Sequence, residues 1–329
     1  MTKKISIFLM VLAIFLPLSL LYGETRTLKA VTAWPKNATD NRAFFIFTEL
    51  VEEMVAKKYP GQLKINYIGG PETIKSTDQA QAVQRGIVDI AFLTTAYYVS
   101  ILPEVDAIKL SEFPSPEERQ KGATKFINEL HEKKLGITYL GRLGLDIKFN
   151  LYLKKPIEKA DLKGLNIRVS PMYLQAIKGL GGNPVVIAPT DVFLALERGV
   201  VDGYCWPEVG IRDWGWEKHT KYMVEPGFYR VPNPLIMNKK AFDSLPKNLK
   251  DLLIEAVIEA EKRTYNLFQD LAKKERPELV KAGIQILELP PAEKEKFLRV
   301  AYDEGWKDII QKVPKEGPEL KKYLTRERK

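Results

Sequence analysis

The chain has 329 residues, with 51 lysines and arginines against 42 aspartates and glutamates, and a formal net charge of +9. This length suits two domains of roughly 100 to 200 residues better than one hydrophobic core. Because positive side chains are interleaved with glutamates, the charge favours a solvated mixed surface over a nucleic-acid-binding stripe. The single cysteine, Cys205, excludes an internal disulfide and a thiolate zinc cluster.

The first 23 residues have the form of a secretory signal. Lys3 and Lys4 precede an apolar run over residues 5–22, which ends at Gly23. We expect residues 1–23 to be a signal peptide cleaved after Gly23, so that the body of the chain lies outside the cytoplasm. Because Leu21 is not a small residue and the run is long enough to span a bilayer, retention as an N-terminal anchor is the alternative.

Strand and helix patterns alternate along the chain, which predicts an α/β fold with mostly parallel sheets. In chain order, the predicted elements are strand 27–34, helix 41–58, strand 63–68, helix 76–85, strand 87–93, strand 165–169, helix 171–180, strand 184–187 and helix 191–198.

Two further segments concern the relation between the halves of the chain. Residues 137–153 form a long apolar and alternating stretch that contains Gly141 and Gly144. A single strand of that length exceeds the usual size, so we expect the stretch to cross between two domains as a hinge. Residues 247–275 keep a 3.6-residue apolar period, which predicts one long helix that spans both lobes.

The pattern A-x-x-R-G-x-V-D occurs twice, at residues 82–89 and 195–202. Each copy predicts the last turn of a helix, a glycine in the left-handed conformation and the entry to a buried strand. One such corner in each half suggests two similar lobes that face each other and hold a small molecule at the carboxyl ends of their strands. The alternative is that the repeat reflects only common helix-capping chemistry.

Motifs for catalysis are scarce. Neither HExxH nor GxSxG occurs, and His131 and His219 have charged neighbours, so we expect both histidines at the surface. Cys205 follows a predicted buried strand and has no histidine close in sequence, so we interpret it as a small apolar residue. The segment Gly69-Gly70-Pro71 lacks the Walker lysine pattern.

Arg168 is the most informative charged residue because it stands inside the predicted buried strand 165–169. A buried guanidinium needs an anionic partner. That partner is either a ligand carboxylate, which a guanidinium binds with two parallel hydrogen bonds, or an internal aspartate or glutamate. Lys148, in an alternating strand, is a similar but weaker case.

Aromatic residues fall at the ends of predicted strands, where a ligand crevice would lie. Each alone is more typical of packing, but their equivalent positions make a ligand-lining role an equal alternative. The candidate ligand-binding residues are Arg168, Lys148, Trp206, Trp34, Thr94, Thr95 and Tyr97, with Tyr98 as a further aromatic at the same strand end.

Several motifs together resemble one family. They are D-L-K-G-L-x-I-R-V at 161–169, Gly182-Asn183-Pro184, the segment 191–203, and P-L-I-M-N at 234–238. In these motifs the chain resembles the extracytoplasmic solute-binding proteins of tripartite ATP-independent periplasmic (TRAP) transporters, of the dicarboxylate-binding-protein type. The resemblance implies a two-lobed periplasmic receptor that closes on an organic acid and delivers it to a membrane transporter driven by an ion gradient.

The resemblance also implies roles for single residues. Arg168 matches the arginine that pairs with the ligand carboxylate, and Lys148 stands where many members carry a second arginine. Trp206 matches a contact position. In a branch that resembles 2-oxo-acid receptors, a glutamate before this tryptophan helps to hold a metal ion. Residue 205 is a cysteine here, so we expect no metal, although residues 222–227 also resemble that branch. Trp206 with Trp34 favours a ligand with an apolar or aromatic body.

The sequence therefore predicts lobe I over residues 24–146 plus about 233–270, and lobe II over 147–232 plus about 271–329. We expect a periplasmic receptor for an organic acid, with an aromatic or 2-oxo acid favoured, which partners the membrane subunits of a TRAP transporter. We expect no cofactor and no nucleic acid, and a monomer or a homodimer. The alternative is an exported enzyme that acts on a small carboxylic acid, which the lack of paired acid and base residues disfavours.

Overall fold

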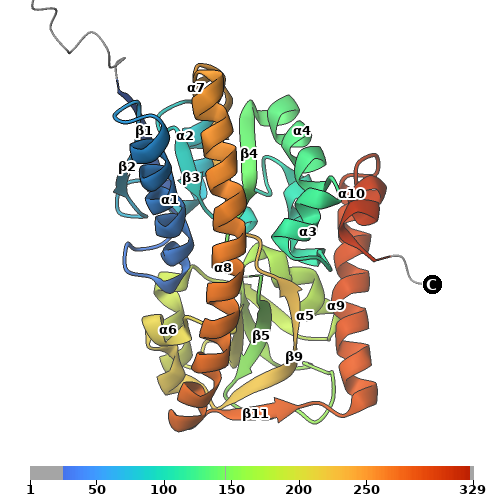
Figure 1. Cartoon of the computed structure of the whole chain (residues 1–329). Helices are drawn as coiled ribbons and strands as arrows, with labels where there is room; N and C mark the ends of the chain where they lie inside the picture. The colour runs from blue at the N-terminus through green and yellow to red at the C-terminus, as the bar shows by residue number, and fades with distance from the viewer. Residues whose placement is uncertain (1–24, 145, 327–329) are drawn as a thin grey trace, which may run out of the picture.

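The computed structural model describes residues 25–144 and 146–326. Two β-sheets lie one above the other in Figure 1, and helices pack around both. The expected signal peptide of residues 1–23 lies outside the described residues. Among the helices of the described ranges, none is long and apolar enough to cross a membrane.

The first sheet has the strand order β2-β1-β3-β10-β4. Strand β1 pairs in parallel with β2 and β3, whereas β10 is antiparallel to β3 and β4. The strands are β1 (Arg26–Thr32), β2 (Leu63–Gly69), β3 (Ile90–Phe92), β4 (Ile137–Arg142) and β10 (Pro234–Asn238). The helices on this side are α1 (Arg42–Lys58), α2 (Gln79–Gln84), α3 (Ser115–Gln120), α4 (Ala123–Leu135) and α7 (Lys239–Asp243).

The second sheet has the strand order β11-β9-β5-β8-β6-β7. Strand β6 is parallel to β7 and β8, β5 is antiparallel to β8 and β9, and β11 is parallel to β9. The strands are β5 (Lys148–Leu153), β6 (Asn166–Val169), β7 (Asn183–Val186), β8 (Gly203–Pro207), β9 (Tyr222–Arg230) and β11 (Gln285–Glu288). Helices α5 (Leu174–Gly179) and α6 (Pro189–Glu197) accompany it.

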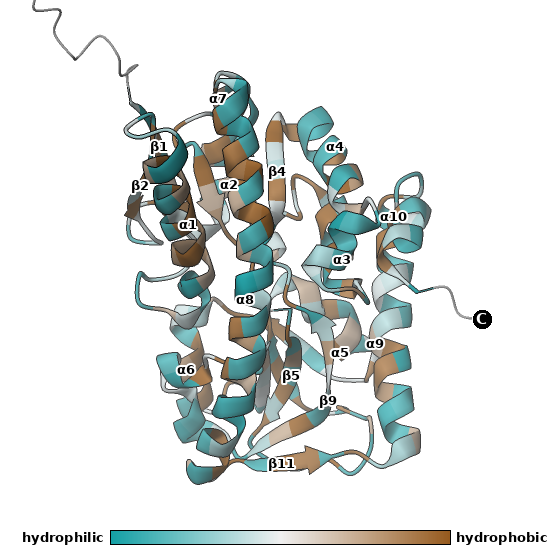
Figure 2. Ribbon diagram, in the orientation of Figure 1, coloured by the Kyte–Doolittle hydropathy of each residue, from teal (hydrophilic) through white to brown (hydrophobic). Residues whose placement is uncertain are grey.

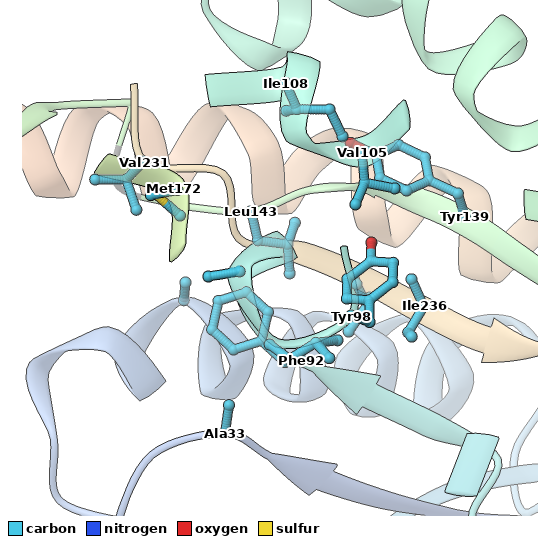
Figure 3. Close-up of a cluster of buried hydrophobic side chains, with 14 of the residues drawn as sticks. Ala33, Phe92, Tyr98, Val105, Ile108, Tyr139, Leu143, Met172, Val231 and Ile236 are labelled. Atoms are coloured by element: carbon cyan, nitrogen blue, oxygen red, sulfur yellow. The ribbon is translucent and has the colours of Figure 1, made fainter. Parts of the chain in front are cut away.

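The central strands are buried along their whole length, as in sheets that are covered on both faces. Every residue of β4, β8 and β10 is buried. Figure 2 shows apolar strands inside and hydrophilic outer faces on the long helices. In the close-up of Figure 3, Phe92, Tyr98 and Ile236 belong to one apolar cluster that also includes Met172 and Val231. This core therefore continues from the first sheet to the edge of the second.

Two short connections carry the chain between the sheets near the middle of the molecule, in addition to the long helix α8 (Lys247–Lys281). The long apolar stretch of residues 137–153 consists of two strands, β4 in the first sheet and β5 in the second. The return crossing runs from β9 to β10, where Leu143 donates its backbone N–H to the carbonyl of Asn233 at 3.0 Å. The two crossing segments are therefore hydrogen-bonded to each other.

Helix α8 (Lys247–Lys281) runs alongside both sheets, as predicted (Figure 1). It packs on α1 and β4 in the upper half and reaches β11 in the lower half. The helix is longer than the predicted 247–275 because it continues through Pro277, where the fully buried Leu279 anchors its last turn.

Two C-terminal helices follow β11. Helix α9 (Pro291–Lys312) packs on α5 and β9 of the lower half and on the 3-10 turns of Pro103–Leu110. Helix α10 (Gly317–Leu324) packs on the same turns and on α4, beside the first sheet. The C-terminal part of the chain therefore contacts both halves of the molecule.

The two copies of the repeated motif form equivalent corners, one in each sheet. Gly86 and Gly199 are left-handed, with φ of +72° and +70°. The Asp89 carboxylate accepts the backbone N–H of Lys29 on β1 at 2.7 Å, and the Asp202 carboxylate accepts that of Asn166 on β6 at 2.8 Å. Each aspartate thus ties its corner to the neighbouring parallel strand.

The expectation of a surface role for His131 is wrong, because its side chain is fully buried. His131 lies one helical turn after Ile127 and so shares the apolar face of α4, while its charged neighbours point outward. Its Nδ1 lies 2.8 Å from the carbonyl of Ile127, so Nδ1 donates and Nε2 accepts from the Tyr98 hydroxyl at 3.1 Å. Burial lowers the pKa of His131 to about 4.

Candidate functional site

A cavity lies between the two sheets, and residues of both sheets line it. The space between its walls is about 400 Å³, with the open solvent at its mouth included. The lining residues are Trp34, Asp40, Thr94, Ala96, Tyr97, Phe149, Arg168, Ser170, Met172, Tyr173, Trp206, Pro207, Val231 and Asn233.

The cavity lies where the carboxyl ends of parallel strands from the two sheets meet. Trp34 follows β1, Tyr97 follows β3 and Ser170 follows β6, while Trp206 is near the end of β8. Residues at these ends project beyond the sheet and can contact a ligand without disrupting the strand pairing. The position that the repeated corner predicts for a ligand crevice is therefore the position of this cavity.

Arg168 is the only arginine or lysine among the lining residues, and it is buried, with 2% of its surface exposed. Its Nε donates to the carbonyl of Ile187 at 2.9 Å, and its Nη1 lies 3.5 Å from the carbonyl of Cys205. No aspartate or glutamate of the described ranges forms an ion pair with it, and burial lowers its pKa. The structure therefore lacks the internal salt bridge that was the alternative for Arg168, and no acidic side chain of the described residues compensates its positive charge.

Two tryptophan rings pack against this guanidinium. The Arg168 Cζ lies 5.5 Å from the ring centroid of Trp206 and 5.9 Å from that of Trp216. The two indoles pack edge to face, with their centroids 4.8 Å apart, and Trp216 stacks on Trp214. This packing fixes the orientation of the guanidinium while its remaining N–H groups stay available.

Three buried polar atoms of the lining residues have no hydrogen-bond partner in the described part of the chain. They are Ser170 Oγ, Trp206 Nε1 and Asn233 Nδ2. A buried donor without a partner costs free energy, and native proteins leave few of them. Their gathering around one cavity indicates a site for a polar molecule.

Asp40 is a lining residue that the sequence did not reveal. It belongs to the short 3-10 turn of Thr39–Asn41 and is only 6% exposed. Burial raises its pKa to about 7, the negative charge of Asp213 adds to the rise, and the Asn233 side chain opposes it. No sequence signal distinguishes this residue from an ordinary helix-preceding aspartate, because its burial depends on the second sheet.

Five of the seven predicted site residues line the cavity, namely Trp34, Thr94, Tyr97, Arg168 and Trp206. Lys148 and Thr95 do not. The Lys148 ammonium bonds to the hydroxyl of Tyr302 at 3.2 Å, and burial together with the charge of Arg230 lowers its pKa to about 8.

Thr95 and Tyr98 are buried at the same strand end as Tyr97, without lining the cavity. Apart from Asp40, the lining residues that the sequence analysis did not name are Ala96, Phe149, Ser170, Met172, Tyr173, Pro207, Val231 and Asn233.

The sequence profile described as "Bacterial extracellular solute-binding protein, family 7" matches residues 36–312. The chain belongs to this family. The match includes every lining residue of the cavity except Trp34. The recognition from the sequence motifs is therefore confirmed.

Named relatives and solved structures are similar to this family 7 protein. It is 26% identical over 273 residues to a monocarboxylate 2-oxoacid-binding periplasmic protein of Nostoc sp., which covers 79% of this chain and 72% of the relative. A Bordetella pertussis extracytoplasmic solute receptor binding pyroglutamic acid is 20% identical with a TM-score of 0.79, over 92% of this chain and 100% of that one.

A TRAP periplasmic solute-binding protein from Desulfovibrio salexigens, with bound orotic acid, has 19% identity and a TM-score of 0.79, over 91% of this chain and 97% of that one. These likenesses confirm the predicted two-lobed α/β fold.

The cavity contains few groups that could hold a metal ion. No group of three or more histidines, cysteines, aspartates or glutamates suited to a metal gathers in the described ranges. Cys205 is fully buried, and burial raises the pKa of its thiol well above the ordinary value, so it stays protonated and is a poor ligand. Asp40 is the only carboxylate among the lining residues of the family 7 cavity.

Proposed function

We propose that this family 7 protein is a receptor that binds an organic carboxylate between its lobes, with Arg168 as the carboxylate-binding residue. The observation that carries the proposal is a guanidinium that is only 2% exposed and lacks an acidic partner in the described ranges. A carboxylate ligand would accept two parallel hydrogen bonds from it and compensate its charge.

The two lobes are proposed to move about the two crossing segments, near residues 143–144, 146–147 and 231–233. Lobe I then contains the first sheet and lobe II the second. Helix α10 belongs with lobe I in this division, rather than with lobe II as the sequence suggested, because it packs on α4. Thr39 of lobe I donates its backbone N–H to the Asp213 carboxylate of lobe II at 2.9 Å, a contact that would break on opening.

The ligand body is proposed to contact Trp34, Tyr97 and Trp206, with Thr94 beside them. Aromatic side chains favour an apolar or planar body over a flexible aliphatic chain. Relatives and neighbours named for a 2-oxoacid, pyroglutamic acid and orotic acid support a small acid of this kind. We further propose that the protein is exported by its N-terminal signal and delivers the acid unchanged to TRAP membrane subunits, without metal or catalysis.

A thermal-shift screen tests the carboxylate. The purified protein is heated with pyruvate, pyroglutamate, orotate or phenylacetate, each paired with its neutral primary amide. Because a ligand that binds only the folded state raises Tm, at least one acid should stabilise the protein and its amide should not. Equal stabilisation by acid and amide would contradict the carboxylate role, and conversion of the bound acid into another compound would favour an exported enzyme.

A further inference from the structure

The cavity has a second polar end, formed by Asp40 and Asn233. Both side chains are buried, at 6% and 1% exposed, and both line the same cavity as Arg168. Asn233 Nδ2 has no partner within 3.5 Å in the described ranges, yet the Asn233 side chain is near enough to Asp40 to lower the pKa of its carboxyl as a hydrogen-bond donor. An acceptor and a donor that form no close hydrogen bond with each other therefore lie side by side in the cavity wall.

The Asp40 turn is held rigidly in place. The Asn41 side chain donates to the carbonyls of Trp34 and Pro35 at 3.0 and 2.7 Å, and its backbone N–H donates to Ala38. A carboxylate on such a fixed turn is preorganised to receive a ligand group.

Asp40 does not neutralise Arg168, although both line one cavity. The two residues form no ion pair, and neither affects the pKa of the other noticeably. Tyr97 lies within reach of both, since the charge of Arg168 lowers its pKa and that of Asp40 raises it. The positive and negative groups therefore form no direct pair, Tyr97 lines the same cavity, and a ligand there can contact both.

We propose that Asp40 and Asn233 form a second subsite, which selects organic acids that carry a hydroxyl or amide N–H group away from the carboxylate. This rests on the proposed function, which places the ligand carboxylate at Arg168. A hydroxyl or an amide group both donates and accepts, so it satisfies Asp40 and Asn233 together. A second carboxylate meets the charge of Asp40 at close range, so simple dicarboxylates are rejected.

The test compares matched acids by calorimetry at pH 8. The sets are 4-hydroxyphenylacetate with phenylacetate, succinamate with levulinate, and 4-hydroxybutyrate with butyrate and succinate. In at least one set, the hydroxyl or amide acid should bind about tenfold to a hundredfold more tightly than its partner, the range for a hydrogen bond to a charged group. Succinate should bind more weakly than 4-hydroxybutyrate.

Variants at Asp40 test whether this residue causes the tighter binding of the hydroxyl or amide acids. Asp40→Leu should reduce it to less than about threefold, whereas Asp40→Asn, which keeps one acceptor, should retain part of it. The acid without the donor group serves as the internal control for a folded site, and Asp78→Asn, at an exposed aspartate of the same lobe, should change nothing.

Equal affinities within every set, or a preference that survives Asp40→Leu, would overturn the second subsite and leave the carboxylate receptor intact. If no acid of any set binds the unaltered protein, or if binding acids are indifferent to Arg168→Lys, the proposed function fails and the subsite fails with it.

Discussion

The guanidinium of Arg168 lies against the face of Trp206, with its central carbon 5.5 Å from the ring centroid, and both residues line the cavity between the sheets. One is at the end of β6 and the other at the end of β8, two strands that pair in parallel. The residue proposed to hold the carboxylate and the residue proposed to contact the ligand body are therefore positioned by the same strand pair.

Trp206→Ala should weaken an aromatic or branched acid by about 1 to 3 kcal/mol through lost apolar contact, and a small dicarboxylate much less. Calorimetry with phenylacetate and succinate measures the difference, and tryptophan fluorescence should change on ligand binding in the unaltered protein. Trp306→Ala, on α9 outside the cavity, is the matched control. Equal weakening of all acids, or of none, would make Trp206 a packing residue only.

Ligand affinity should survive extensive chelation. The cavity residues include one carboxylate, Asp40, and the residue before Trp206 is a buried cysteine rather than an oxygen ligand. Because calcium-type sites need several oxygen ligands, this set is too small for such an ion. Binding of a stabilising acid before and after EDTA treatment, each measured by calorimetry, checks the point. Loss of binding that calcium restores would contradict it.

Asp40 should make the stability of the free protein depend on pH. Its pKa is raised from 3.8 to about 7 by burial and by Asp213, with Tyr97 and Asn233 also facing it. The folded state therefore binds the proton more tightly than the unfolded state, and the stabilisation present below pH 4 is lost as pH rises through 7. The full effect is about 4 kcal/mol.

Asp40→Asn should thus gain stability relative to the unaltered protein as pH rises from 4 to 8. Denaturant unfolding at each pH measures this, with Asp78→Asn as the exposed control. A difference that is constant across this range would show that Asp40 titrates normally.

His131 should affect the pH dependence of stability in the opposite direction to Asp40. Burial lowers its pKa to about 4, so the unfolded state binds the proton more tightly. Its contribution is present above pH 6.5 and is lost as pH falls through 4, by about 3 kcal/mol in all. His131→Gln should flatten the acid side of the stability profile. The half-buried His219 is the matched control, and an equal slope in the His131 and His219 variants would be incompatible with a neutral buried ring.

Local patterns predicted the strands and helices of residues 27–93 and 165–198 and the long helix α8, but not the helices of residues 115–135 or the C-terminal helices α9 and α10. The repeated corners, the alternating strands and the apolar face of α8 depend on residues close in sequence, and their positions agree with the structure within a few residues. The end of α8 was missed because a proline usually stops a helix, whereas burial of Leu279 outweighs that cost.

The cavity was only partly predictable. Arg168, Trp34 and Trp206 stand at strand ends, which a sequence can reveal, but Asp40 and Asn233 face the cavity only because two distant segments meet there. The expectation that His131 lies at the surface was wrong for the same reason, because its burial depends on the packing of Tyr98 and Tyr139 against α4.

The measurement that tests the central claim most directly is calorimetry of Arg168→Lys with the acid that stabilises the unaltered protein most. Lysine keeps the charge but loses the planar, bidentate fork, so affinity should fall by about 2 to 4 kcal/mol. Arg198→Lys, at the exposed arginine of the second corner, should bind normally. Unchanged affinity in a folded Arg168→Lys protein would contradict the account, because the carboxylate would then be bound elsewhere.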